Sequence, residues 1–383
     1  MSLITILLRC VKQGLVSGKI QSIDSAYINA NASIDGLKEV KLVDRDPEDY
    51  LDEIRQQDGA QFVYGEDAKV QAQKRLKKTQ EHLEKHKEYR KKKITKNDGG
   101  KAHRKNKRRF LSNATHQSAT DPEARIAKKN GKPRMLCYSS MMSVDSQELV
   151  ITHMQAELAH KKDSRYLITT AKQTKERLDK LGLQVETILA DAGFSSGENY
   201  ATLEALGLDA LIPVHGTFKE RRKDFIYDPV QDVYTCQQGE RLEYRQTDKS
   251  GGYVKKRYLS SKKVCNECPL RTSCVNSRGY KEISHTVYRK QYDEMIAKLK
   301  SEKGKQSYAL RMQTVEPVFG TLQQHYGMRW INTRGKDLAN KVMLMAAAAV
   351  NLKKLVKSRI NKHLIAVWHC IHRHTIYNID LAI

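Results

Sequence analysis

Long apolar runs are missing from this 383-residue sequence. The apolar stretch 342–350 is too short to span a bilayer, which takes about 20 residues. The apolar stretch 4–8 has no basic segment before it and no small-residue cleavage site after it, so it does not read as a signal peptide. These absences exclude membrane-spanning and secreted proteins and predict a cytoplasmic location.

The sequence also lacks internal repeats and the even cysteine count of a disulfide framework. It has seven cysteines, and four of them fall between residues 236 and 274. This pattern is typical of a metal cluster with additional free thiols in a reducing compartment.

Acidic residues are scarce relative to basic ones. There are 44 Asp and Glu against 69 Lys and Arg, a formal charge of +25. Solubility does not require so much positive charge, so the composition indicates a polyanionic partner, with nucleic acid first. Residues 74–109 alone hold 17 Lys and Arg against 4 Asp and Glu. This tract fits sequence-independent phosphate binding or, equally, a solvated helix.

Apolar periodicity predicts an α/β core. A helix over residues 3–16 leads into a buried strand, and its position at the very start of the chain is typical of a late start that omits a preceding domain. The elements expected next alternate between strand and helix. They are strand 20–30, hairpin strands 135–145 and 148–158, helix 164–181, strand 185–190, helix 198–206 and strand 210–214. This order predicts an RNase-H-like mixed sheet with flanking helices.

The remaining segments are insertions and a helical C-terminus. A charged helical insertion contains a helix over 71–93 and a basic loop over 96–109, and a turn-rich, cysteine-bearing insertion follows the core. Three helices are expected over 288–300, 306–326 and 338–357, the last of them buried. The predicted division is 1–37 (helix and first core strand), 38–119 (basic insertion), 120–215 (core), 216–287 (cysteine-rich, zinc-ribbon-like), 288–357 (C-terminal helices) and 358–383 (tail).

Three carboxylates stand out as a candidate metal site. Asp24 lies inside a strand of otherwise small or apolar residues, where a carboxylate is costly unless it is paired or binds a cation. Asp191 ends a strand just before a glycine turn, and Glu316 lies on a predicted helix about one turn after Arg311. Three acids converging in basic surroundings can hold two Mg²⁺ ions for phosphodiester chemistry. The alternatives are a hydrogen-bonded structural Asp and a solvated helical Glu.

Five segments resemble the DDE transposases of bacterial insertion sequences, in the branch with a cysteine-bearing insertion, and they occur in that family's order. They are IDSAYINANAS from Ile23, TDPEARIAKKNGK from Thr120, LADAGFSSGENYATLEALGLDALIP from Leu189, the four-cysteine segment, and TVEPVFGTLQQHYGMRWINTRG from Thr314. Together they extend over most of residues 20–354.

The resemblance implies an RNase-H-like fold with Asp24, Asp191 and Glu316 as the catalytic acids, holding Mg²⁺ or Mn²⁺. It implies metal-dependent cleavage at transposon ends and strand transfer by a homodimer on DNA, in the bacterial cytoplasm at the nucleoid. The residues expected to contact DNA are Arg311, Arg329, Arg334, Tyr308 and Lys336.

The sequence departs from that family in three places. The helical N-terminal domain of the relatives, which helps to bind transposon ends, has no counterpart here. Tyr308, Arg311 and Glu316 resemble three members of a Tyr, Arg, Glu, Lys signature, but Gln323 stands where Lys is expected. The tail after Lys357 resembles nothing in the family. These departures keep two alternatives open: an inactive, truncated DNA-binding remnant and an RNase-H-like nuclease.

Two further features have competing interpretations. Asp121 is a second candidate for the first acid, but the loop before it and Pro122 after it favour a capping or substrate-side role. Cysteines in a C…C-x₂-C-x₅-C pattern fit a structural Zn²⁺ site, with unpaired buried thiols as the alternative. They are Cys236, Cys265, Cys268 and Cys274.

Overall fold

A computed structural model gives the three-dimensional structure of most of the chain. It describes residues 2–39, 81, 84, 85, 88, 89, 111–128, 131, 133–215, 224–250, 253–275 and 277–379, with side chains described up to residue 360. Most of the predicted helix 71–93 and all of the predicted loop 96–109 lie outside the described residues.

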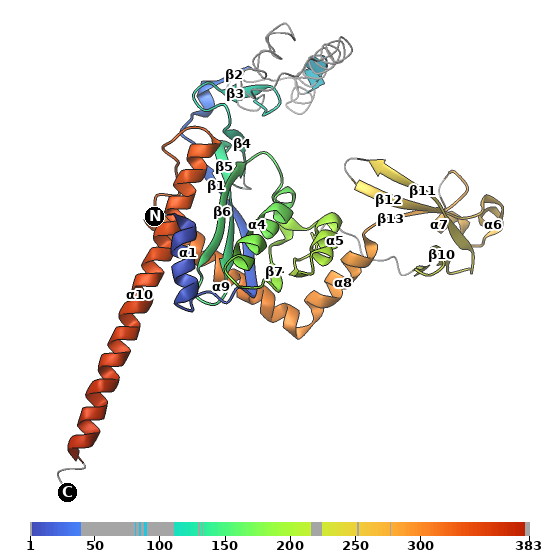
Figure 1. The fold of residues 1–383 in the computed structure, drawn as a ribbon. Coiled ribbons are helices and arrows are strands. Elements are labelled where there is room, and N and C mark those ends of the chain that lie inside the picture. The colour runs from blue at the N-terminus through green and yellow to red at the C-terminus, as the bar shows by residue number, and fades with distance from the viewer. Residues whose placement is uncertain are drawn as a thin grey trace, which may run out of the picture.

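A six-stranded mixed sheet forms the centre of the molecule (Figure 1). Its strands in spatial order are β4 (Arg125–Ala127), β5 (Met135–Asp145), β1 (Ile20–Asn29), β7 (Thr187–Leu189) and β8 (Asp209–Leu211), with β6 (Ile151–Leu158) also paired to β5. β5 runs antiparallel to β1, β4 and β6, whereas β7 and β8 run parallel to β1. This topology is compatible with the predicted RNase-H-like fold, and the predicted mixed α/β class is confirmed.

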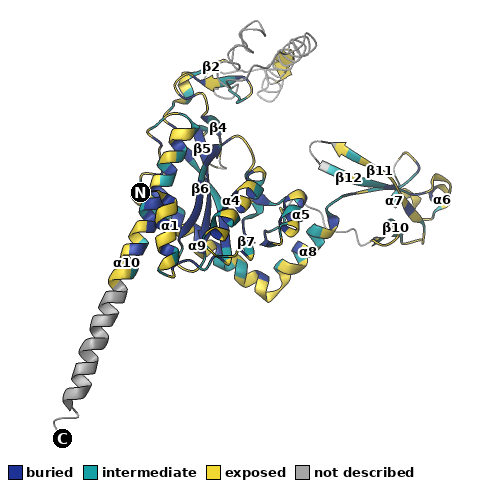
Figure 2. Ribbon diagram, viewed as in Figure 1, coloured by how far each residue is buried: buried dark blue, intermediate teal, exposed yellow. Residues whose placement is uncertain are grey.

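Helices cover the sheet, which is why its central strands are buried on both faces. In β5 every residue after Met135 is buried. α4 (Leu167–Asp179) packs on β6, β5 and β1, α9 (Glu302–His325) packs on β1, and α10 (Lys336–Ile379) packs on β6 and α1 (Leu3–Lys12). Figure 2 shows the resulting buried layer between α1 with α10 on one side and α4 with α5 (Gly197–Ala205) on the other.

The C-terminal helix is longer than the sequence predicts. α10 continues to Ile379, through most of the segment expected to be a tail (Figure 1). Met343 and Ala347 are fully buried in the core, but Met345 is 71% exposed. The predicted burial of this helix therefore holds for most of residues 342–350, with Met345 as the exposed exception.

A second, smaller sheet fills much of the predicted cysteine-rich insertion. Its strands, in spatial order, are β13 (Glu282–Thr286), β12 (Tyr253–Leu259), β11 (Arg241–Ser250), β10 (Val233–Cys236) and β9 (Phe225–Asp228), all antiparallel. Two short helices, α6 (Lys262–Glu267) and α7 (Arg271–Cys274), lie between β12 and β13. The sequence expectation of a turn-rich stretch missed these strands.

The remaining elements are short. They are η1 (Ile34–Gly36), β2 (Leu37–Glu39), β3 (His116–Ser118), η3 (Asp163–Arg165), η4 (Ala192–Phe194) and α8 (Arg289–Lys300). β2 and β3 pair with each other and bracket the polar insertion. No helix among the described residues is long and apolar enough to cross a membrane.

His153 makes the core sensitive to acid. It is 2% exposed in β6, and burial, with the charge of Arg177, lowers its pKa to about 3. Because the folded pKa lies below the ordinary value of about 6.5, neutral His153 contributes stability that is complete above pH 6.5 and is lost as the pH falls towards 3. Acidification from pH 7 to pH 5 should therefore lower the free energy of unfolding by about 2 kcal/mol through His153 alone.

We therefore expect His153→Gln to reduce the loss of unfolding free energy on acidification from pH 7 to pH 5. Urea denaturation at the two pH values measures this difference. An equal loss in both proteins would contradict the role given to His153, whatever the absolute stability of the variant.

Candidate active site

The parallel pairing of β1 with β7 brings two aspartates to the same level of the sheet. Ser22 in β1 is opposite Leu189 in β7. Asp24 and Asp191 each lie two residues further along, and neighbouring strands are about 4.8 Å apart. The predicted convergence of these two acids is therefore supported by the strand register.

Asp24 is held in a largely desolvated position. Its side chain is 18% exposed, its Oδ2 accepts a hydrogen bond from Arg311 Nη1 at 3.2 Å, and its Oδ1 accepts one from the Ser25 amide at 2.7 Å. Burial raises the pKa of Asp24 to about 6, with further increases from the charges of Asp191 and Asp163, and the Ser25 amide and Arg311 oppose this rise. A neighbouring cation therefore stabilises the charged form of this desolvated carboxylate.

Asp191 stands at the start of a tight turn. It is the N-cap of η4, and its Oδ1 accepts a hydrogen bond from the Gly193 amide at 2.8 Å. A Cβ added to Gly193 would lie 3.0 Å from that oxygen, so a larger residue would require the carboxylate to shift by a few tenths of an ångström. The turn fixes the carboxylate at the carboxyl end of β7, where sheet edges expose side chains to ligands.

Arg311 comes to Asp24 from α9, across 287 positions of sequence. It is 6% exposed, its guanidinium lies 5.6 Å from the centre of the Tyr308 ring, and its Nε has no hydrogen-bond partner. A buried guanidinium beside a buried carboxylate supplies the positive charge that Asp24 requires. The sequence predicted Arg311 as a DNA contact and did not anticipate this pair.

Glu316 does not share the buried side of α9. Arg311, Val315 and Val318 are buried, whereas Glu316 is exposed. Five residues of helix separate it from Arg311, which places it about 140° around the axis. The structure therefore brings Asp24, Asp191 and Arg311 together and leaves Glu316 on the open side of the same helix. Its assignment as the third acid stays a prediction.

Asp163 is an acid that the sequence interpretation missed. It lies in η3, which packs against η4, and its charge raises the pKa of Asp24. The Asn199 side-chain amide ties the two turns together by donating to the carbonyls of Ser164 at 2.8 Å and Phe194 at 2.9 Å. The order of the strands does indicate this position for Asp163. η3 follows β6, which is parallel to β1 and ends at the same edge of the sheet.

Asp121 serves the start of α10. It is fully buried, and its Oδ1 accepts hydrogen bonds from the Tyr138 hydroxyl at 2.7 Å and the Gly335 amide at 3.2 Å. Glu123 accepts one from the Lys336 amide at 2.7 Å. Unpaired amides at a helix N-terminus favour such carboxylates, so the capping interpretation of Asp121 is confirmed.

Three other predicted DNA contacts lie on or beside the loop between α9 and α10. Arg329 and Arg334 are exposed, and Lys336 forms an ion pair with Glu157 at 3.2 Å. The loop runs beside the end of β1, since Asn29 bonds to the backbone of Arg329 and Ile331. Exposed cations thus border the strand that holds Asp24.

Within the described part of the chain, no group of three or more His, Cys, Asp or Glu side chains is gathered closely enough to hold a metal ion. This applies to the three predicted acids and to the four cysteines in their present arrangement. The two neighbouring aspartates are oxygen donors of the kind that Mg²⁺ and Mn²⁺ prefer.

The family comparison covers the C-terminal third of the chain. Residues 235–356 match the family model described as transposase DDE domain, a range that includes α9 and begins after Asp24 and Asp191 in the sequence. No curated protein matches the chain. The match supports a DDE transposase family, and with it a nuclease-type enzyme of phosphoryl transfer, DNA as the partner and divalent metals as the usual cofactor.

Proposed function

We propose that this protein is a DDE transposase that cuts DNA at transposon ends and transfers the cut strand to target DNA. The observation that carries this proposal is the juxtaposition of Asp24 and Asp191 on neighbouring parallel strands, with Arg311 from α9 donating a hydrogen bond to Asp24. The family match over residues 235–356 supports the same chemistry.

The site fits a divalent cation by the nature of its donors. Asp24 and Asp191 both offer carboxylate oxygens, and the side chain of Asp191 is only half-buried. Asp24 and Asp191, with Glu316 as third acid by family resemblance, would hold Mg²⁺ or Mn²⁺. Bound there, the metal supplies activation of the attacking oxygen and neutralisation of charge on the leaving oxygen.

The protein's own residues position the DNA. Arg329 and Arg334 present exposed guanidinium groups near the end of β1, where they can contact phosphates. Tyr308 is 36% exposed beside Arg311 and can stack against a base or sugar. Phosphate contacts of this kind set the register of DNA over the acids without reading its sequence.

The biological setting follows from the family resemblance. We propose an insertion-sequence protein of a bacterium, acting at the nucleoid as a homodimer that pairs two transposon ends. The basic tract 74–109, with 17 Lys and Arg against 4 Asp and Glu, would supply added phosphate contacts. Strong weakening of DNA binding with rising salt is the property expected of that tract.

The test is Mg²⁺-dependent cleavage of DNA that carries the element's own ends, comparing the wild-type chain with Asp191→Asn. We expect cleavage by the wild type and its loss in the variant, with DNA binding retained by both. Asp191 is the better probe because its side chain is only half-buried and carries no ion pair with Arg311.

A catalytically inactive DNA-binding remnant is the second candidate. The exposed position of Glu316 and the glutamine at 323 favour it. Salt-sensitive DNA binding without cleavage by either protein would support the remnant and contradict the transposase. Equal cleavage of DNA with and without the transposon ends would instead identify an RNase-H-like nuclease.

A further inference from the structure

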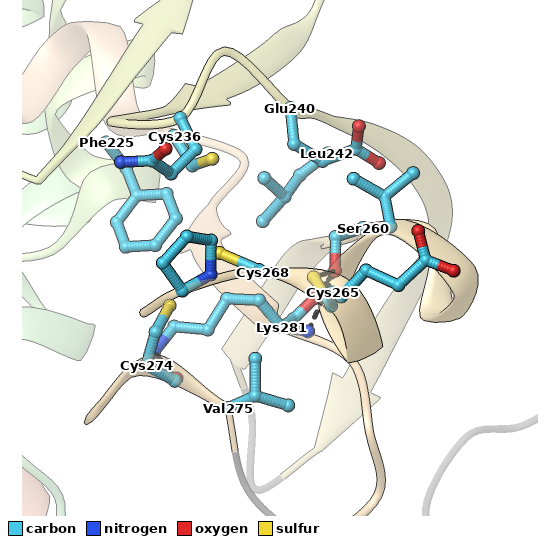
Figure 3. A pocket seen from close by; sticks show the side chains of 14 residues that line it. Phe225, Cys236, Glu240, Leu242, Ser260, Cys265, Cys268, Cys274, Val275 and Lys281 are labelled. Carbon is cyan, nitrogen blue, oxygen red and sulfur yellow. Dashed lines mark hydrogen bonds between the residues drawn. The ribbon is translucent and has the colours of Figure 1, made fainter. Parts of the chain in front are cut away.

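Four cysteines from separate elements line one pocket in the small sheet and its two helices, residues 224–287, here named the cysteine module. The pocket has a volume of about 290 Å³. Figure 3 shows the side chains around it, with sulfur atoms on several of its sides. The cysteines are Cys236, Cys265, Cys268 and Cys274.

Local backbone geometry holds these cysteines around the pocket. Cys236 ends β10, where its amide donates to the Glu240 carbonyl at 2.9 Å and its carbonyl accepts from the Gly239 amide at 3.0 Å. Gly239 has φ +78°, a conformation that favours glycine. Cys265 lies in α6 and Cys268 follows it, so a C-x₂-C pair stands at the end of one short helix.

The two other described cysteines lie in the main core, far from this pocket. Cys10 and Cys137 are deeply buried, and burial raises the pKa of their thiols to about 11 and about 12. Their thiols donate to the Asn351 carbonyl and to Asn29 Oδ1. Such thiols stay protonated and inert, so they provide internal controls for the pocket cysteines.

The cysteine module has little hydrophobic core of its own. Among its described residues, the buried apolar cluster consists of Phe225, Tyr234, Leu242 and Tyr258. A unit of this size usually needs a disulfide or a metal to hold it together. All of the described cysteines are free, so disulfides do not supply that link.

A cation also lies against the pocket. Lys281 lines it, donates to the Cys274 carbonyl and lies over the Phe225 ring at 5.5 Å. Four thiolates around one divalent ion leave a net negative charge, which a neighbouring ammonium stabilises.

We propose that Cys236, Cys265, Cys268 and Cys274 bind one structural Zn²⁺ ion. Each thiol loses its proton to solvent, and four Zn–S bonds of about 2.3 Å replace the open pocket. The thiols are not gathered into a metal-holding group in the described residues, so binding draws α6 and α7 towards β10. The ion stabilises the fold of the cysteine module and takes no part in phosphoryl transfer.

The experiment measures zinc in the full chain, purified without chelators, by elemental analysis. We expect about one Zn²⁺ per chain. Cys268→Ser and Cys274→Ser should lose it, whereas Cys10→Ser and Cys137→Ser should keep it. Because a serine variant could fail to fold, the wild type is also reconstituted with Co²⁺, and thiolate-to-cobalt charge-transfer absorption is expected.

Three results would overturn the zinc site. They are a wild-type chain that contains no zinc and gives no charge-transfer absorption with Co²⁺, a Cys268→Ser variant that retains full zinc, and a mass that shows disulfides among the pocket cysteines. None of these readouts involves DNA cleavage, so the zinc site and the transposase function are tested independently.

Discussion

Asp24→Asn and Glu316→Gln are each expected to slow Mg²⁺-dependent cleavage of the element's ends by about 10³-fold or more. A catalytic metal lowers the barrier by several kcal/mol, and each 1.4 kcal/mol corresponds to about tenfold in rate. Asp179→Asn is the matched control, since this acid lies on the surface of α4 in an ion pair with Lys175. It should leave cleavage unchanged, and circular dichroism should show that all three variants are folded.

The same assay decides which carboxylate completes the set. Glu316 is third by resemblance, but Asp163 is the acid whose charge raises the pKa of Asp24 alongside that of Asp191. Asp163→Asn is expected to lower cleavage less than Glu316→Gln does. Full activity in Glu316→Gln with a large loss in Asp163→Asn would contradict the family assignment and move the third ligand to η3.

The residues of the family signature lie close together on α9. Its signature positions Tyr308, Glu316 and Gln323 lie within about 80° of one another around the helix, on the open side, with Arg311 at their edge. DNA that lies along this side of α9 would contact all four.

Much of the main core could be predicted from periodicity. β1, the β5–β6 hairpin, β7 and β8 are apolar enough to be predicted directly, and Asp191 was found because it follows β7. The strands of the cysteine module could not be read this way. Residues 241–250, which form β11, contain almost no apolar side chain, so no alternation marks them as a strand.

Contacts between segments that are far apart in the sequence also could not be predicted. The Arg311 pair with Asp24 depends on how α9 is rotated against β1, and no spacing within either segment encodes that angle. The length of α10 was also missed. The predicted helix ended at Lys357, and the segment after it was assigned to a tail, whereas α10 continues to Ile379.

The Arg311 pair leads to the second large effect. Arg311→Met is expected to lower the free energy of unfolding by about 3 kcal/mol near neutral pH, since removing one partner leaves a buried carboxylate without its counter-charge. The pKa of Asp24 should rise above its present value of about 6, because the guanidinium is one of the groups that lower it. Urea denaturation across pH gives both quantities.

The pH dependence distinguishes a lost charge from lost packing. The folded pKa of Asp24 is raised above its ordinary value, so the ionised form costs stability at high pH, and that cost disappears as the pH falls and Asp24 takes up a proton. The defect of Arg311→Met should therefore shrink between about pH 7.5 and pH 5. A defect that is constant over this range would indicate that Arg311 acts through packing against Tyr308 instead.

A double variant completes the argument. Asp24→Asn with Arg311→Met removes both charges, and replacing a buried pair by neutral groups costs far less than breaking it. The double variant should thus be more stable at neutral pH than Arg311→Met alone. If it is equally unstable, the two side chains are not coupled, and Arg311 is not the group that compensates the charge of Asp24 before a metal ion is bound.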